Sequence, residues 1–285
     1  HPLCIWSLTA RTIGKIIMPA TILIRGGGDL ASGVALRLHH IGLNVVITEI
    51  PKPLAVRRAV AFAEAIYEGQ ITIEDVAARS VHDPSDTFKI LNVISKGQIP
   101  VLIDPDCVSA LALNPLAIVD ARMTKHPPEA MSHHALLYFG LGPGFTAPSN
   151  CHAVIETQRG HTLGRVIWNG SSLPDSGQPE GNPHRILRAP RDGSFKSSAK
   201  IGEHIEEGQE IGSVDNEKIT APLTGVLRGI IHDGLDVTKG LKIGDIDPRD
   251  QREYCFTVSD KALAIGGGVL EALFARPEVR SKLWA

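Results

Sequence analysis

Apolar and polar positions in the first fifty residues predict short strands and a helix in turn. Residues 21–25 are apolar and β-branched, which predicts a buried strand. After Asp29, apolar residues recur at spacings of four, four and three, as expected for one face of a helix: Leu30, Val34, Leu38 and Ile41. Residues 45–48 are apolar again and end at Glu49. The pattern therefore predicts strand, glycine turn, helix and strand over 21–49.

The glycine turn between the first strand and the helix has the spacing of a nucleotide-binding loop. Gly26, Gly28 and Ala31 fit the pattern G-x-G-x-x-A, with Gly27 between them. Such a turn lets the backbone approach a pyrophosphate, and the helix N-terminus supplies N–H donors. Glu49 lies 23 residues after Gly26, where an acid can bind ribose hydroxyls.

One residue of this turn favours a simpler reading. Asp29 places a negative charge in the first turn of the helix, where it suits the helix dipole but competes with a phosphate. The glycines would also serve a tight turn alone, with Asp29 only capping the helix.

Further apolar runs end in polar or glycine-rich tips, as strands of a parallel sheet do at a ligand crevice. The predicted strands with their tips are 99–103 with Asp104, 116–120 with Asp120 and 136–139 with 140–144. Helices are predicted at 54–67 and from 83–86 through Ser95, a hairpin or short helix at 69–79, and strands at 152–157 and 163–168. We therefore expect an α/β fold with a Rossmann-like, mostly parallel sheet domain.

The C-terminal half contains an internal repeat of 32 residues. Ala189-Pro190-x-x-Gly193 recurs as Ala221-Pro222-x-x-Gly225, and a glycine and isoleucine/valine pattern that follows it recurs at the same offset. The repeat predicts two similar β-units related by a pseudo-twofold axis. It resembles a small all-β barrel-sandwich hybrid domain of the biotinyl/lipoyl type. Lys218 lacks the flanking methionines of that family's carrier lysine, so a recognition or spacer role is expected.

These patterns predict a division of the chain into two domains. Residues 1–17 are expected to be an extension outside the fold, and 18–169 the Rossmann-like domain. A linker is predicted at 170–185, where Gly, Ser, Pro and Asn are frequent, and the barrel-sandwich domain at 186–250. Residues 256–285, with a helix at 258–275, are expected to pack back on the first domain, because Gly266, Gly267 and Gly268 suit close packing.

The composition of the chain argues against several classes of protein. A net charge of −2 supports no broad attraction to nucleic acid or membranes. Four scattered cysteines without a C-x-x-C pattern argue against a disulfide scaffold or a zinc ribbon, and they suit a reducing, cytoplasmic compartment. No apolar run reaches the length of a membrane span. The adjacent pairs His39-His40 and His133-His134 lack the i, i+4 spacing of metal ligands, so no metal site is predicted.

Several segments together resemble a known family. They are RGGGDLASGVA (25–35), VDAR (119–122), LGPGFTA (141–147), CHAVIET (151–157), RGH (159–161), RAP (188–190) and KIGDIDPR (242–249). The chain resembles the YqeB-type accessory proteins of selenium-dependent molybdenum hydroxylases, whose Rossmann-like half is similar to the XdhC family. The resemblance implies a maturation factor that binds a molybdopterin-type cofactor and assists its modification or insertion into a xanthine dehydrogenase-like apo-enzyme.

The predicted anion-binding residues follow from the need for N–H donors and cations around a phosphate ester. Those of the first turn are Gly26, Gly27, Gly28, Asp29 and Ser32, with Glu49 at the next strand tip. Asp120 is a further candidate at its strand tip. After it, Arg122 and Lys125 are candidates to neutralise phosphate, and Gly142 and Gly144 to form a second backbone cradle.

Cys151 beside His152 is a weak catalytic candidate, because an imidazole can activate a thiol. Adjacent strand residues point to opposite faces, so both cannot face one ligand within a strand. A buried structural cysteine is the favoured interpretation. Glu156 shares the face of His152, and both are predicted as polar contacts to the cofactor.

Two other functional classes remain open at this point. The glycine turn and Glu49 also suit an NAD(P)-dependent oxidoreductase, although no residue stands out as its proton donor. A protein-interaction module without a ligand is the third reading. The sequence favours an accessory protein over a classical enzyme, and leaves open the handling of selenium or sulfur and the formation of a homo-oligomer.

Overall fold

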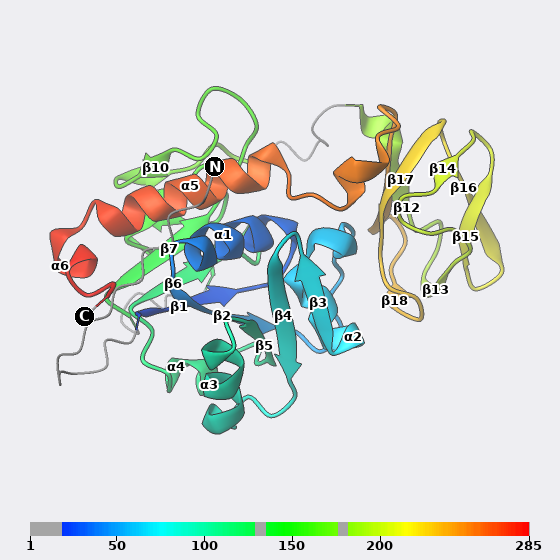
Figure 1. Ribbon diagram of the computed structural model, residues 1–285. Coiled ribbons are helices and arrows are strands. Elements are labelled where there is room, and N and C mark those ends of the chain that lie inside the picture. The colour runs from blue at the N-terminus through cyan, green and yellow to red at the C-terminus, as the bar shows by residue number, and fades with distance from the viewer. Residues whose placement is uncertain (1–18, 129–134, 176–181, 285) are drawn as a thin grey trace, which may run out of the picture.

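The computed structural model describes residues 19–128, 135–175 and 182–284 (Figure 1). Its first unit, which lies before residue 176 and also includes residues 260–284, contains a nine-stranded sheet. In spatial order its strands are β10 (Val166–Ile167), β9 (Ala153–Ile155), β7 (Leu137–Leu141), β6 (Ala117–Asp120), β1 (Thr21–Arg25), β2 (Asn44–Glu49), β5 (Ile99–Ile103), β4 (Val76–Val81) and β3 (Gln70–Ile73). The strands from β9 to β4 pair in parallel. At the two edges, β10 and β3 pair antiparallel with their neighbours.

Helices cover both faces of this sheet because the side chains of its strands alternate. Ile22 and Ile24 of β1 belong to the core under α1 (Asp29–His40) and α5 (Asp260–Phe274). Leu23, between them, belongs to the opposite core, under α3 (Thr87–Ser95) and α4 (Val108–Leu111). Buried apolar runs on both faces are typical of parallel strands that are covered by helices.

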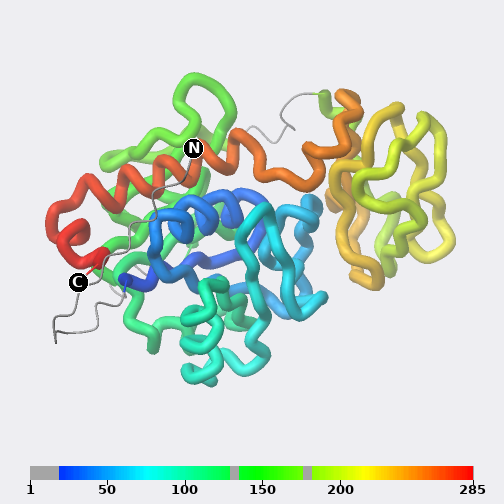
Figure 2. The backbone as a smooth tube through the Cα atoms, in the orientation of Figure 1, coloured from blue at the N-terminus to red at the C-terminus, as the bar shows by residue number. Residues whose placement is uncertain are grey.

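Helix α5 follows the C-terminal strands in the sequence, but it packs on the first unit, where it lies along α1 (Figures 1 and 2). Glycines permit this close approach. A Cβ built on Gly33 of α1 would lie 2.6 Å from the Cβ of Ala262 in α5, and one built on Gly266 would lie 2.8 Å from the carbonyl oxygen of Gly33. Packing against α1, Gly164 and the sheet therefore explains Gly266 and Gly268 in the middle of α5 but not Gly267, where an added Cβ would meet no described atom within 4 Å.

The second unit, called here the C-terminal unit, consists of two four-stranded antiparallel sheets. Their strands are β12 (Ile186–Arg188), β13 (Gly193–Ser197), β14 (His204–Ile205), β15 (Glu210–Val214), β16 (Glu217–Thr220), β17 (Gly225–Ile230), β18 (Asp236–Val237) and β19 (Lys242–Asp247). One sheet has the order β12-β19-β17-β14 and the other β16-β15-β13-β18. The strand pairs β13/β17, β14/β18 and β15/β19 begin 32 residues apart, so each sheet combines two long strands of one repeat with a short strand of the other. The predicted repeat is present in the strands.

Short elements complete the described chain. They are η1 (Arg58–Val60), η2 (Phe62–Glu64), α2 (Ala65–Glu68), β8 (Thr146–Ala147), β11 (Gly170–Ser171), η3 (Pro183–Arg185), η4 (Arg252–Cys255) and α6 (Pro277–Arg280). The prediction of one helix over 54–67 was wrong. That segment forms two 3₁₀ turns and one helical turn, because it packs in the angle between the two units and its backbone follows those contacts.

The predicted fold class is corrected by these sheets. A Rossmann-like mostly parallel sheet domain with a barrel-sandwich hybrid does not describe the chain, because the large sheet is mixed, with antiparallel strands at both edges, and the C-terminal unit forms two separate antiparallel sheets. The antiparallel edge pair β3/β4 confirms the hairpin, one of the two alternatives predicted for 69–79. The predicted extension at 1–17 and the middle of the predicted linker, 176–181, lie outside the described residues.

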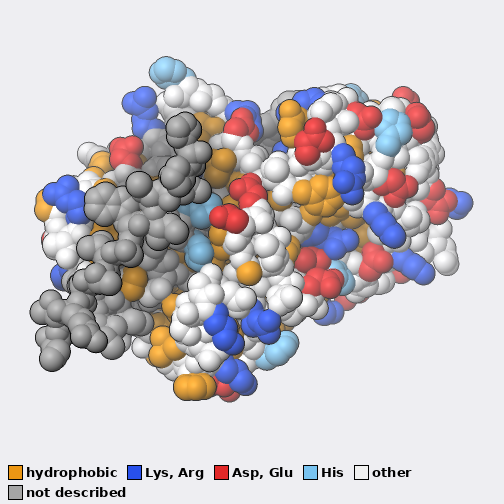
Figure 3. All heavy atoms as spheres, viewed as in Figure 1, with side chains coloured by type: hydrophobic (Ala, Val, Ile, Leu, Met, Phe, Trp, Pro, Cys, Tyr) orange, Lys and Arg blue, Asp and Glu red, His pale blue; other side chains and the backbone are white. Residues whose placement is uncertain are grey.

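Acidic and basic side chains are interspersed over the C-terminal unit on the face shown in Figure 3. In the described ranges, no helix combines the length and the apolar composition that a membrane crossing requires.

Candidate functional site

The glycine turn after β1 opens onto a large cleft. Gly26 has a φ of +90°, which favours glycine, and Gly28 stands at the N-terminus of α1, which no described side chain caps. A Cβ built on Gly28 would meet no described heavy atom within 4 Å. Both glycines line a cleft of about 1200 Å³. The first-turn N–H groups of a helix are donors for an anion, so this end of α1 can receive one.

The cleft lies between the two units and is rich in cations. Its lining includes ten lysines and arginines but six aspartates and glutamates, whereas the whole chain has a net charge of −2. The tips of β1, β2 and β6 form one wall, and β17, β19 and the segment after them contribute the other. A concave surface with an excess of one charge attracts ligands of the opposite charge.

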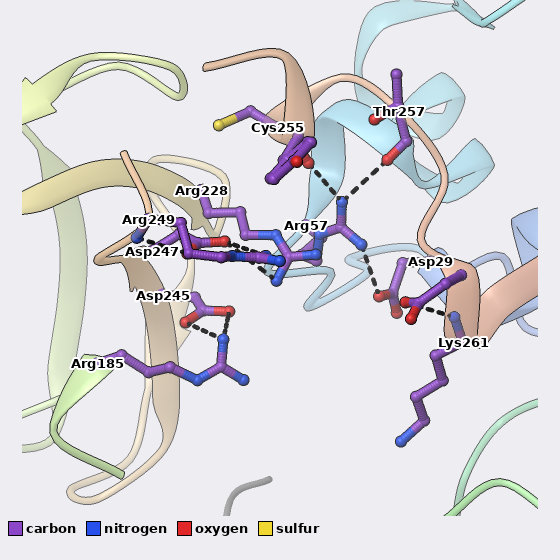
Figure 4. Close-up of polar contacts among 12 residues, drawn as sticks. Asp29, Arg57, Arg185, Arg228, Asp245, Asp247, Arg249, Cys255, Thr257 and Lys261 are labelled. Atoms are coloured by element: carbon purple, nitrogen blue, oxygen red, sulfur yellow. Dashed lines mark hydrogen bonds and ion pairs between the residues drawn. The ribbon is translucent and has the colours of Figure 1, made fainter. Parts of the chain in front are cut away.

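Arg57 connects the two walls (Figure 4). Its Nη2 donates to the carbonyl oxygens of Tyr254 (3.0 Å) and Thr257 (3.2 Å), and its Nη1 lies 3.6 Å from Asp29. The side chain of Arg57 is only 9% exposed, so this arginine is not part of a solvated surface. Burial, followed by the charge of Arg228, lowers the pKa of Arg57.

Two Asp-x-Arg pairs present guanidinium groups to the cleft from different units. Asp120 of β6 is fully buried and accepts from Arg122 Nη2 (2.6 Å) and Nε (2.9 Å). Asp247 of β19 accepts from Arg249 with the same two distances. Each carboxylate fixes the arginine two residues later in a bidentate pair, which limits its rotamers. Asp120 thus orients Arg122 and does not itself line the cleft.

The other predicted cations and acids of the sheet edge also line the cleft. Lys125 does so with an ion pair to Asp175 at 2.8 Å. Glu49 accepts the backbone N–H of Gly27 (2.7 Å) and of Ile50 (2.8 Å), and burial raises its pKa. Glu49 therefore holds the glycine turn in shape, and both of its oxygens already accept a hydrogen bond.

Ser32, predicted to contact phosphate, lies outside the cleft. Its hydroxyl is fully buried, donates to the carbonyl oxygen of Gly28 (2.9 Å) and accepts from the N–H of Phe62 (2.8 Å). It ties the start of α1 to the following loop. Gly27 is buried beside Ala63, whose backbone nitrogen would lie 2.9 Å from a Cβ there.

The predicted second glycine cradle does not face the cleft. A Cβ on Gly142 would overlap the hydroxyl of Thr157, and one on Gly144 the carbonyl oxygen of His126. Both glycines also have positive φ, 71° and 102°. Their identity is explained by backbone conformation and close packing, and only Pro143 between them lines the cleft.

Cys151, His152 and Glu156 serve the fold around β9. Cys151 is 1% exposed, and burial raises the pKa of its thiol to about 11, so a thiolate is not available near neutral pH. The favoured interpretation of Cys151 as a buried structural cysteine is confirmed, and the weak catalytic candidate is not supported. His152 Nδ1 accepts the N–H of Tyr138 (2.9 Å). Buried Glu156 accepts the N–H groups of Gln158 and Leu173, so neither side chain lines the cleft.

Three potential ligand atoms of a metal lie near the junction of the units, on Glu64, Glu68 and His232, within 4.8 Å of one another. Glu64 is already paired with Arg58 at 2.9 Å, which opposes a second cation. The sequence reasoning missed this cluster because its members come from both units.

The sequence reasoning also missed the cations that the C-terminal unit contributes, Arg185, Arg188, Arg228, Lys242 and Arg249. Two of these lie in KIGDIDPR, whose D-x-R spacing repeats that of VDAR. That recurrence was the available signal, because a carboxylate two residues before an arginine can fix it in the same way in both places.

Comparison with known proteins adds one relative. No family model matches the chain. It is 47% identical over 257 residues, 88% of its own length, to "Uncharacterized protein YqeB" of Escherichia coli (strain K12).

Solved structures give weaker matches. One is an aspartoacylase family protein from Mesorhizobium loti, with 9% identity, 80% of this chain and 84% of that chain covered, and a TM-score of 0.26. Another is a succinylglutamate desuccinylase/aspartoacylase from Rhodobacter sphaeroides, with 10% identity, coverages of 80% and 86%, and a TM-score of 0.22. At such TM-scores the likeness carries no argument.

The sequence identity, 47% over 88% of the chain, makes the chain a homologue of Escherichia coli YqeB. The chain spans about half the length of that relative.

Proposed function

We propose that this protein is an accessory factor that binds a phosphorylated, molybdopterin-type cofactor in the cleft between its two units. The cofactor would there be held for modification or for insertion into a selenium-dependent molybdenum hydroxylase of the xanthine dehydrogenase kind. The support is the family resemblance in the sequence together with one structural observation. An uncapped helix N-terminus at Gly28 opens onto a cleft with an excess of cationic side chains.

The residues of the cleft fit an anionic, phosphate-bearing ligand. Arginines held in bidentate pairs are pre-oriented, and the planar guanidinium group matches phosphate geometry. Buried nitrogen atoms of the cleft, Nε of Arg57 and of Arg228, have no hydrogen-bond partner among the described residues. A polar ligand would supply acceptors for them. The chain's own residues would bind and orient the cofactor, and the cofactor would supply its metal chemistry to the client enzyme.

The test is cofactor retention by the purified protein. Protein incubated with a molybdopterin source and then washed should keep the pterin, detected by its fluorescence after oxidation. Gly28→Asp should lose it, because the new carboxylate stands at the helix N-terminus that would receive the anion. Aspartate is also a good N-cap, so this variant should be at least as stable as the wild type. Stability is measured by thermal unfolding.

Asn92→Asp is the matched control. Asn92 is exposed on α3 and does not line the cleft, and the substitution changes the net charge by the same amount. It should retain pterin like the wild type. A wild-type protein that keeps no pterin, or equal retention by Gly28→Asp, would refute the proposal.

NAD(P) is the second candidate occupant, because a glycine turn with an acid at the next strand tip also occurs in dinucleotide sites. Glu49 already accepts two backbone N–H groups, which leaves it less acceptor capacity for ribose hydroxyls. Thermal unfolding with NAD(H), NADP(H) and the pterin compares the two candidates. Stabilisation by a nicotinamide dinucleotide alone would favour an oxidoreductase, and stabilisation by none of them a protein-interaction module.

A further inference from the structure

Three cations line the cleft where the C-terminal unit approaches the start of α1, and the charge of Asp29 acts on two of them, Arg57 and Lys242. We call them the seam cluster: Arg57 from the loop before η1, Arg228 from β17 and Lys242 from β19. All three line the cleft that also contains Gly28 and Asp29. Figure 4 shows the guanidinium of Arg57 between Asp29 and the arginines of the C-terminal unit.

Arg57 is only partly neutralised. Two of its hydrogen bonds go to carbonyl oxygens, and the nearest carboxylate, Asp29, is 3.6 Å away. Its side chain is more than nine-tenths buried, and its Nε has no hydrogen-bond partner among the described residues. A buried guanidinium that makes no hydrogen bond to a carboxylate costs free energy, which an anion in direct contact with it would offset.

The carboxylate nearest to Arg228, that of Asp247, also binds a second arginine. Arg228 Nη1 lies 3.7 Å from Asp247, which already accepts two short hydrogen bonds from Arg249. The Nε of Arg228 is buried and has no hydrogen-bond partner in the described ranges. Arg228 and Arg57 are also close enough for the charge of Arg228 to lower the pKa of Arg57. Two like charges in one partly buried place point to an anion between them.

Lys242 is the third cation. In the part of the chain that the structure describes, its ammonium group makes no hydrogen bond or ion pair, and burial lowers its pKa. The carboxylate of Asp245, in the same strand, is held by Arg185 at 3.2 Å. Lys242 therefore lines the cleft as a desolvated charge that no described carboxylate contacts.

We propose that the seam cluster is an oxyanion subsite that holds a phosphate or diphosphate group of the ligand between the two units. Guanidinium forks and an ammonium group bind phosphate oxygens, and the N-terminus of α1 beside Asp29 adds backbone donors. The identity of the whole ligand rests on the proposed function, whereas the anion subsite can be tested without a pterin. The C-terminal unit is thus half of the binding site, and a bound ligand joins the two units.

The experiment uses inorganic phosphate and pyrophosphate as probes, in a chloride buffer free of phosphate. Pyrophosphate should bind the wild-type protein in calorimetry and raise its Tm by several degrees, as expected for a ligand that binds only the folded state at concentrations well above its Kd. Affinity should fall as salt is raised, because the attraction is between charges. Similar affinities for the two probes indicate a single phosphate group, and a preference for pyrophosphate indicates a diphosphate.

Lys242→Met is the decisive variant, because it removes a charge without taking a partner from any described residue. Its Tm without anion should equal or exceed that of the wild type, and its Kd for pyrophosphate should rise about tenfold, the effect of losing one charged hydrogen bond. Arg228→Met should weaken binding similarly. Arg191→Gln is the control, since Arg191 is exposed on the same unit and does not line the cleft.

The outcomes separate this inference from the proposed function. No pyrophosphate binding by the wild type, or equal binding by Lys242→Met, would overturn the subsite. Pyrophosphate binding that Lys242→Met weakens, without pterin retention by the wild type, would support the subsite and refute the proposed cofactor. Pterin retained equally by the wild type and Lys242→Met would refute the subsite and leave the proposed function standing.

Discussion

Substitution of neighbouring glycines in α5 by alanine should have opposite effects on stability: Gly267→Ala should stabilise the protein, and Gly268→Ala should destabilise it. A Cβ built on Gly267 would meet no described atom within 4 Å. One built on Gly268 would overlap the carbonyl oxygen of Gly164 and lie 2.9 Å from Ile155 Cγ2. The two positions share one helix and one neighbourhood, so they differ mainly in what an added methyl group would contact.

The expected magnitudes follow from this difference. Glycine inside a helix costs about 1 kcal/mol relative to alanine, so Gly267→Ala should raise the free energy of unfolding by up to that amount. Gly268→Ala gains the same helix propensity but forces α5 away from a carbonyl oxygen in the backbone, and overpacking costs about 1–3 kcal/mol or more. Its net effect should be destabilisation by up to about 2 kcal/mol or more.

Gly266→Ala provides an intermediate case. Its Cβ would lie 2.8 Å from both the side-chain Cγ of Arg37 and the carbonyl oxygen of Gly33. The exposed arginine can move, whereas the carbonyl oxygen belongs to the backbone of α1 and cannot move without the helix. Gly266→Ala should therefore be destabilised, but less than Gly268→Ala.

Urea unfolding, followed by far-UV circular dichroism, measures all three variants against the wild type. A change in the midpoint at constant slope would report stability alone. The reasoning would be refuted if Gly268→Ala were as stable as Gly267→Ala, or if Gly267→Ala were destabilised like the other two.

Three further predictions concern buried polar groups. Asp120→Asn removes the charge that faces the guanidinium groups of Arg25 and Arg122, so the free energy of unfolding should fall by about 3 kcal/mol in urea titrations. Arg58→Met leaves the buried carboxylate of Glu64 without its 2.9 Å ion pair and should cost about 1–3 kcal/mol at pH 8. Burial raises the pKa of Glu64, so the folded protein holds the proton more tightly than the unfolded chain, and this cost should shrink at pH 5; an equal cost at both pH values would contradict the assignment. The thiol of Cys151 has a pKa raised from 9.0 to about 11, so its protonated form stabilises the folded state fully below pH 9. This stabilisation, about 2.7 kcal/mol in all, is lost as the pH rises through 11. Cys151→Ala should therefore lose less stability than the wild type over that range, and parallel losses would show that the thiol does not titrate as buried.

Local elements could be predicted where the sequence itself determines them. The strand and helix boundaries around the glycine turn were confirmed, because a run of β-branched residues, glycines with positive φ and a helical apolar face act over short distances. The helix predicted from 83–86 through Ser95 was also confirmed, and its start is fixed by Asp86, which accepts the N–H of Lys89. In contrast, residues 54–67 have good helix propensity, but their contacts with the C-terminal unit decide their conformation.

The candidate site could be predicted only on the side that the strand tips form. Gly28, Arg122 and Lys125 follow strands whose carboxyl ends meet at one edge, and the structure brings all three to the cleft. Arg228 and Lys242 lie on strands of the other unit, and a repeat within one unit carries no information about how that unit docks. Ser32 was misplaced because a hydroxyl near a glycine turn can serve either a ligand or the loop beside it.

The position of α5 has a consequence for biogenesis. This helix covers the apolar face of α1, yet the ribosome synthesises it after the whole C-terminal unit. During synthesis the first unit therefore exposes part of its apolar core, to which chaperones can bind, until α5 leaves the ribosome. Slow translation or misfolding of the C-terminal unit would prolong that exposure, so substitutions in the second unit should appear in cells as aggregation of the first.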